Sequence, residues 1–379
     1  MHVPGAPPTE PPLRAPLTIT PTLTVSEEYN DNILLDNRNK QYDFITSFTP
    51  GIAVSADSTV YHLLAAYSFR ADVYARDESR SEPFARHSFT FEGSYRASPA
   101  LTLSLSETFF RANDTNLVAR KGVSTGRTRS YSNSIAPGVS YRFDRLTTLR
   151  TFASYTILRF DDKRLFDSDA LRVDAHIDRM LTPRLTGTLG YEFAYFDIDR
   201  LGTTTVHTPL AGLTYRFTET LTGTVSRGPS FVHDTGANDD RVTPTVSTSL
   251  VQRLAFGSAA LVYERSVGTA GGLGGTTDNQ SIGAVFRVFP LRGLALELAP
   301  RYITTESDNS SIDVQAWSLP LRVSYQINRY LTAVAGYQFF RQRSTGTLRD
   351  ALGTTSLGSD VDQNRVAVGL QIGYPIGIE

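Results

Sequence analysis

The residues of this sequence that are best placed to do chemistry are arginines beside short polar breaks. Only three of the 37 basic residues are lysines, so guanidinium groups carry almost all of the positive charge. A guanidinium stays charged at any ordinary pH and holds carboxylates and phosphates through paired N–H donors. Six arginines are predicted to share one face and one height of their elements, namely Arg96, Arg142, Arg150, Arg216, Arg253 and Arg287.

These six charges at one level would form a ring that favours anions. The alternative is that they pair with acids in the neighbouring turns, such as Asp144 and Glu219, or reach toward lipid phosphates. A second basic group lies in the long break 112–127 and consists of Arg120, Lys121 and Arg127. That break is long enough to fold inward as a constriction, and a surface loop is the alternative.

The sequence offers little for catalysis or metal binding. The absence of cysteine excludes disulfides, thiolate ligands and cysteine nucleophiles. His176 shares a face with Asp174 and Asp178, which could orient it as a base, but no serine motif accompanies it. The acidic stretch 233–240 lacks the spacing and the closing glutamate of a calcium-binding loop. We therefore predict no enzyme, no cofactor and no metal site.

The elements that carry these residues alternate in polarity along the chain. In Leu101–Ser106 every odd position is leucine and every even position is threonine or serine, and the same period of two recurs in Val366–Tyr374. A period of two is typical of a strand with one apolar and one polar face. No comparable stretch keeps a period of 3.6, so we predict no helices.

The breaks between these strands are of two alternating kinds. From Asp144 onward short turns recur about every 35–38 residues, and longer polar breaks fall between them. Eight short and nine long breaks join about eighteen strands of about 10–13 residues, a length that crosses a bilayer at a tilt. This pattern predicts an all-β fold, a transmembrane antiparallel up-and-down β-barrel of about 18 strands. The alternatives are a β-solenoid, whose period would be nearer 20–30 residues, and a large sandwich.

Composition sets further limits. The 379 residues are 40% hydrophobic and 20% charged, and their formal net charge is −1. This near-neutral balance argues against a nucleic-acid partner, and no apolar run is long enough for a transmembrane helix. Residues 1–16 are proline-rich and lack the features of a secretory signal, so we expect a flexible tail there and the barrel at 17–379.

The two faces of the predicted strands can be assigned. Aromatic residues mark both ends of the apolar face, with Tyr95 and Tyr141 near short breaks and Tyr155 and Tyr191 near long ones. Such girdles flank the lipid-facing band of membrane barrels, so the polar face must line the interior. Pairs of opposite charge on one inward face are predicted for Arg70/Asp72, Arg172/Asp174 and Glu297/Arg301.

Two segments resemble known bacterial barrels. Val366–Tyr374, VAVGLQIGY, resembles the terminal strand by which the barrel-assembly machinery recognises its clients. Ser26–Ile33, SEEYNDNI, resembles the opening motif of the β-barrel porin type 2 family. That resemblance implies a Gram-negative outer-membrane barrel linked to exopolysaccharide and exosortase genes. Physically, Asn30, Asp31 and Asn32 need only be turn-forming residues.

The predicted function is an outer-membrane pore for passive passage of hydrophilic solutes, with a preference for anions if the arginine ring is free. One alternative is a conduit for secreted polysaccharide that works with a periplasmic export protein. Another is a non-conducting scaffold or receptor. We expect outer-membrane lipid, lipopolysaccharide and the barrel-assembly machinery as partners, no nucleic acid, and both termini in the periplasm.

Overall fold

The computed structural model describes residues 17–118, 124–236, 239–269, 271–307, 313–344 and 360–378. The first half of its wall contains β1 (Leu17–Asn30), β2 (Asp43–Asp57), β3 (Tyr61–Tyr74), β4 (Glu82–Arg96), β5 (Leu101–Asp114), β6 (Arg127–Arg142), β7 (Thr147–Phe160), β8 (Ser168–Thr182) and β9 (Leu185–Ile198). The second half contains β10 (Gly202–Arg216), β11 (Leu221–Asp234), β12 (Asp239–Leu254), β13 (Gly257–Thr269), β14 (Thr276–Leu291), β15 (Leu294–Leu298), β16 (Arg301–Glu306), β17 (Asp313–Gln326), β18 (Leu331–Ser344), β19 (Val361–Gly373) and β20 (Ile376–Ile378).

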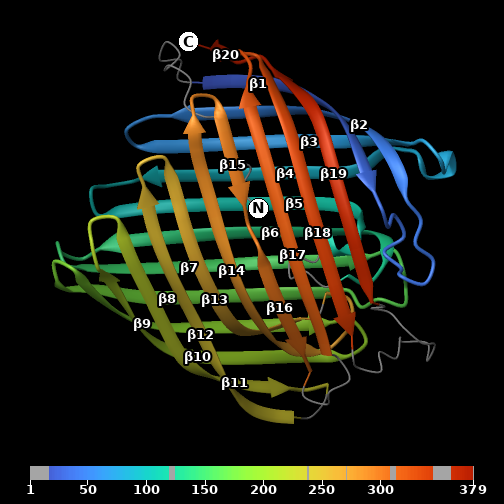
Figure 1. Ribbon diagram of the computed structural model, residues 1–379. Coiled ribbons are helices and arrows are strands. Elements are labelled where there is room, and N and C mark those ends of the chain that lie inside the picture. The colour runs from blue at the N-terminus through green and yellow to red at the C-terminus, as the bar shows by residue number, and fades with distance from the viewer. Residues whose placement is uncertain are drawn as a thin grey trace.

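The strands form one closed antiparallel barrel (Figure 1). Successive strands lie side by side, and β1 pairs with β19, so the wall has no open edge. The segments β15 and β16 are one strand interrupted at Ala299 and Pro300, because both keep the same register against β14. In the same way β19 and β20 are one strand against β1, interrupted at Tyr374 and Pro375. The prediction of an all-β barrel of eighteen strands is confirmed.

Two short helices depart from the expectation of none. A 3-10 turn, η1 (Glu78–Arg80), lies between β3 and β4, and α1 (Thr115–Val118) follows β5. Both fall in long breaks, where backbone that leaves the wall must satisfy its own hydrogen bonds. In the described residues no helix is long and apolar enough to cross a membrane. The tail predicted for residues 1–16 lies outside the described residues.

The outside of the wall is apolar in its middle. Leu103 and Val139 face each other across β5 and β6, both are exposed, and Leu189 on β9 is 70% exposed. Large aliphatic side chains at such exposure on most strands are unsuited to water, because burying each in an apolar medium is favourable by about 1.5–3 kcal/mol. The alternation thus places its apolar face outward, the reverse of a soluble barrel.

Aromatic side chains border this apolar band. Near the short turns Tyr141 packs edge-on against Phe143, with ring centroids 5.1 Å apart, and Tyr95 is exposed. Near the long loops Tyr155 and Tyr191 are exposed, and Trp317 packs on Tyr302 at 4.3 Å. Amphipathic rings at both rims suit the boundary between hydrocarbon and water.

The buried core lies inside the barrel, at the end that carries the long loops. One cluster joins Leu35, from the β1–β2 loop, to Ala316, Phe340 and Val361. A second cluster holds Leu165, from the β7–β8 loop, against the inner wall, and a third holds Ile33, from the same β1–β2 loop as Leu35. The inward residues toward the short turns, by contrast, are exposed or only half-buried. The described interior is therefore a cup that is open toward the short turns and packed toward the long loops.

Candidate functional site

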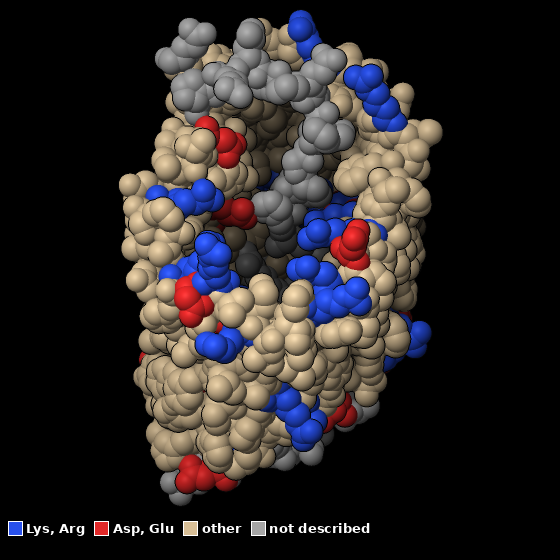
Figure 2. Space-filling view, turned by 90° about the vertical axis from the view of Figure 1, so that its left-hand side faces the viewer, with Lys and Arg blue, Asp and Glu red and all other residues tan. Residues whose placement is uncertain are grey.

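The open end of the cup is rimmed with basic side chains. Figure 2 looks at the short-turn end, where Lys and Arg side chains surround a hollow. Arg96, Arg142 and Arg216 are the last residues of β4, β6 and β10, and Arg253 is the next to last of β12. Each alternates with an outward residue such as Tyr95 or Tyr141, so each points to the lumen side of the wall.

The six arginines predicted to share one height fall into two tiers. Arg96, Arg142, Arg216 and Arg253 are exposed at the rim, and among the described residues none of them has an ion-pair partner. Arg150 and Arg287 lie deeper along their strands and are paired, with Asp178 at 2.5 Å and with Glu297 at 2.8 Å. Among the described residues, the six arginines are thus four guanidiniums without an ion-pair partner at the rim and two paired ones farther along their strands.

The turn acids do not neutralise the rim. The carboxylate of Asp144 accepts the backbone N–H groups of Leu146 and Thr147, at 2.6 and 2.8 Å, and so caps its own turn. The Leu146 N–H in particular holds the pKa of Asp144 below its usual value. This carboxylate is committed to the backbone, which leaves the nearby Arg142 without it.

Of the three predicted pairs along single strands, one forms. Arg70 Nε donates to Asp72 at 2.5 Å. Arg172 instead donates to Glu192 at 2.7 Å and to the carbonyl of Val267 at 2.8 Å. The partner of Glu297 is Arg287 on the next strand rather than Arg301. Glu297 lies directly opposite Arg287 on the neighbouring strand, which explains that pairing, and Glu192 is the diagonal cross-strand neighbour of Arg172.

Asp178 does not orient His176 as a base, the arrangement that their shared face made conceivable. Asp178 accepts from Arg150 and from Thr188, at 2.5 and 2.7 Å, so it is engaged elsewhere. The imidazole lies against Gly190, where an added Cβ would come within 2.3 Å of Nδ1. The described residues contain no group of three or more potential metal ligands.

The β5–β6 loop turns into the barrel. Ser124 donates its backbone N–H to Gln342 on β18 at 2.7 Å, and the Gln342 amide donates to the Ser124 carbonyl at 2.9 Å. Arg127 donates to the Tyr74 hydroxyl and to the Ile33 carbonyl, at 2.8 and 3.3 Å. Arg120 and Lys121 lie outside the described residues. The described part of this loop thus contacts β18 and β3 inside the barrel, and a constriction by the loop stays a prediction.

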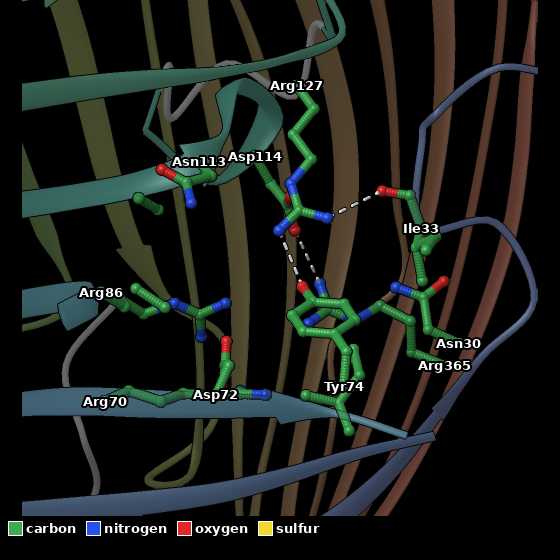
Figure 3. A pocket seen from close by; sticks show the side chains of 13 residues that line it. Asn30, Ile33, Arg70, Asp72, Tyr74, Arg86, Asn113, Asp114, Arg127 and Arg365 are labelled. Carbon is green, nitrogen blue, oxygen red and sulfur yellow. Dashed lines mark hydrogen bonds and ion pairs between the residues drawn. The ribbon is translucent and has the colours of Figure 1, made fainter. Parts of the chain in front are cut away.

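A buried ionic cluster lies below that loop (Figure 3). Glu28 on β1 binds Arg365 on β19 at 2.8 Å and Arg70 on β3 at 3.4 Å. Arg365 also reaches Asp114 at the end of β5, at 3.4 Å. In the sequence analysis only Arg70 of these three residues is assigned to the inward face, and no local pattern brings it together with Glu28 and Arg365, because the three come from strands far apart in the chain. The only indication in the sequence is that each of these residues lies at an inward position of the polar–apolar alternation of its strand.

The SEEYNDNI segment has a structural role at the seam of the barrel. Asp31 accepts from the backbone and side-chain amides of Asn364, at 2.7 and 2.8 Å. The Asn32 amide donates to the Asp362 carbonyl at 3.0 Å, and Asn32 is fully buried. These residues were interpreted as turn formers, but they also fasten the first strand to the last.

Comparison with known proteins gives only distant structural likenesses. No protein-family model and no curated protein matches the chain, so the resemblance to the porin type 2 family stays a prediction. Among solved structures, OpdK of Pseudomonas aeruginosa with vanillate has a TM-score of 0.47 and 13% identity, over 94% of this chain and 99% of that one. OccAB4 of Acinetobacter baumannii has 0.46 and 11%, over 96% and 99%. The siderophore receptor PirA of P. aeruginosa has 0.45 and 10%, over 97% and 81%. None of these scores reaches 0.5, so function is argued from the chain's own residues.

Proposed function

We propose that this chain is a channel of a Gram-negative outer membrane that passes compact hydrophilic solutes and prefers anions. The observation that carries the proposal is the combination of a lipid-suited outer wall with a polar, arginine-rimmed interior. A closed barrel satisfies all of its strand hydrogen bonds within a bilayer, and an apolar band between aromatic girdles is how such barrels sit there. Barrels of about 16–18 strands are wide enough to enclose an aqueous path.

The anion preference rests on the four rim arginines. Arg96, Arg142, Arg216 and Arg253 have no ion-pair partner in the described part of the chain, so their fields are not cancelled locally. The low-dielectric wall concentrates that field in the lumen, which raises the local concentration of anions. Mobile salt screens exposed charges beyond about 8 Å at physiological ionic strength, so the preference should weaken in concentrated electrolyte.

The packed long-loop end bears on solute size. Inward residues there, among them Thr277, Thr305 and Gln342, are fully buried, so the described lumen narrows toward the long loops. A narrow path favours small solutes over a polymer chain. The polysaccharide conduit therefore has no specific support among the described residues. The remaining alternative, a barrel that does not conduct, is distinguished from a channel by recording conductance in a planar bilayer.

The test is single-channel recording of the purified full chain in planar bilayers, with the reversal potential measured across a KCl gradient. We expect discrete conductance steps. The reversal potential should have the sign of the chloride equilibrium potential, which shows that chloride crosses more readily than potassium. Replacing Arg96, Arg142, Arg216 and Arg253 together by glutamine should shift that potential toward cation preference, most strongly at low salt. A protein that inserts but never conducts would overturn the channel. An unchanged reversal potential in the quadruple variant would overturn the role of the rim.

A further inference from the structure

The ionic cluster below the β5–β6 loop has more positive than negative charge. Its four guanidiniums come from four strands and face three carboxylates, those of Glu28, Asp72 and Asp114. The four arginines of this cluster are Arg70, Arg86, Arg127 and Arg365. Burying an excess charge is costly unless a counter-charge is present, so the imbalance needs an explanation.

Each carboxylate of the cluster is already engaged. Glu28 is held by Arg365 and Arg70, and Asp114 is held by Arg365. Asp72 accepts from Arg70 at 2.5 Å and from the Ser47 hydroxyl at 2.7 Å. Two arginines, Arg86 and Arg127, lie outside these pairs. Arg127 donates to the Tyr74 hydroxyl and to the Ile33 carbonyl, so one arginine is left without an acceptor in the described part of the chain.

That arginine is Arg86 on β4. Among the described residues it has no hydrogen-bond or ion-pair partner, and its guanidinium carbon lies 5.8 Å from the centre of the Phe110 ring. Arg86 is half-buried and lines a pocket together with Arg70, Asp72 and Asp114. In Figure 3 its guanidinium points into the same space as the side chains of Arg70 and Asp72. Its N–H donors are thus turned toward a recess of the lumen and have no acceptor in the described part of the chain.

We propose that the Arg86 recess is a binding site for a small oxyanion, a phosphate group or a carboxylate carried by a passing solute. Both groups offer two oxygens at the spacing of paired guanidinium N–H donors. Arg70 and Arg365 hold the three carboxylates of the cluster, so those acids are already engaged by guanidiniums other than that of Arg86. Because the recess lies within the packed half of the lumen, it suits a compact anionic group. The inference deepens the proposed function by placing an anion site inside the channel, and it rests on that function for its role in passage.

Binding can be measured apart from conduction. The full chain, folded in detergent micelles, is titrated with inorganic phosphate and separately with acetate in an isothermal calorimeter. We expect saturable binding of at least one of the two, and the one that binds identifies phosphorylated or carboxylated solutes. Arg86→Gln should weaken that binding about tenfold or more, since a hydrogen bond to a charged group contributes about 1.5–3 kcal/mol. Arg86→Lys should retain part of it, because the charge remains but the paired donors are lost.

Arg111→Gln is the matched control. Arg111 precedes Ala112, the residue that faces Arg86 across β4 and β5, so it lies at nearly the same height. Arg111 lies an even number of residues from the exposed Leu103 and Leu105 on the same strand, so its side chain is on the outward face, away from the lumen. Loss of its charge should leave anion binding unchanged. Heat-dependent migration of each variant on a gel establishes that its barrel has folded. If Arg86→Gln does not fold, the anion affinity of Arg86→Lys is compared with that of Arg111→Gln, and a loss confined to Arg86→Lys supports the site.

The outcomes separate this inference from the proposed channel. Absence of saturable binding for both anions, or binding that Arg86→Gln and Arg86→Lys leave intact, overturns the Arg86 site even if the barrel conducts. Binding that depends on Arg86 in a barrel that never conducts upholds the site and overturns the channel.

Discussion

Glu28 on the first strand of the barrel binds Arg365 on the last described full-length strand, with an Nη–Oε distance of 2.8 Å and side-chain exposures of 6% and 9%. The two residues are 337 positions apart in the chain. Their ion pair lies on the inner face of the seam where the wall closes, beside the amide contacts of Asp31 and Asn32. Closure of the barrel and assembly of the lumen cluster are therefore one event.

Glu28→Gln should destabilise the folded barrel by about 3–5 kcal/mol, because removing one partner of a buried pair leaves the other charge uncompensated. The measurement is urea-induced unfolding of the full chain in lipid vesicles. The matched control is Glu27→Gln, since Glu27 is the exposed neighbour and, in the described part of the chain, accepts a side-chain hydrogen bond from Thr46 alone. We expect the control to change stability by less than about 1 kcal/mol. Equal losses in both variants would contradict a special role for the seam pair.

The direction of the wall can be tested with a charge on either face. Leu103→Arg and Val139→Arg place a guanidinium on the exposed apolar band and should each cost about 2–4 kcal/mol in vesicles. Ser104→Arg and Ser140→Arg, on the adjoining inward positions, should cost clearly less, because Ser104 is exposed and Ser140 half-buried on the open side of the lumen. Folding yields that do not differ between the two pairs would show that the inside and outside are assigned wrongly.

The even number of strands returns the chain to its starting side, and bacterial barrels have short periplasmic turns and longer extracellular loops. We expect both ends of the barrel in the periplasm and the long loops outside the cell. A protease site inserted at Gly353, in the β18–β19 connection, should be cut when protease is added to intact cells. A site inserted at Asp144, in the short β6–β7 turn, should be protected until the outer membrane is opened. The opposite pattern would invert the orientation.

The anchoring of the β5–β6 loop should limit conductance. Gln342→Leu removes both hydrogen bonds to the Ser124 backbone, each of which contributes about 0.5–1.5 kcal/mol. We expect larger or more variable single-channel conductance, because the loop is then released from the far wall. Gln338→Leu is the control, since Gln338 lies on the same strand and the same inward face, four residues nearer the short turns. Identical conductance traces for Gln342→Leu and the parent would show that this loop does not restrict the path.

The amino-acid sequence by itself determined the architecture. The period of two fixes which side chains share a face, as in Leu101–Ser106, and the alternation of short and long breaks fixes the number and order of the strands. Such information is local, because a strand pairs with its neighbour in sequence in every hairpin of an up-and-down barrel. For the same reason the inward positions of Arg86, Arg96 and Arg142 could be predicted without a structure.

Only the tertiary structure decided which inward residues meet. Arg365 contacts Glu28 because the barrel closes, and Ser124 contacts Gln342 because a loop crosses the lumen. Neither contact can be predicted from the alternation of polar and apolar residues within one strand. Arg287 is paired because Glu297 lies opposite it on the neighbouring strand. Arg142 lies opposite Thr148 and has no ion-pair partner among the described residues. Register across the wall and packing across the lumen, rather than residue type, therefore separate the neutralised arginines from those left to attract a solute.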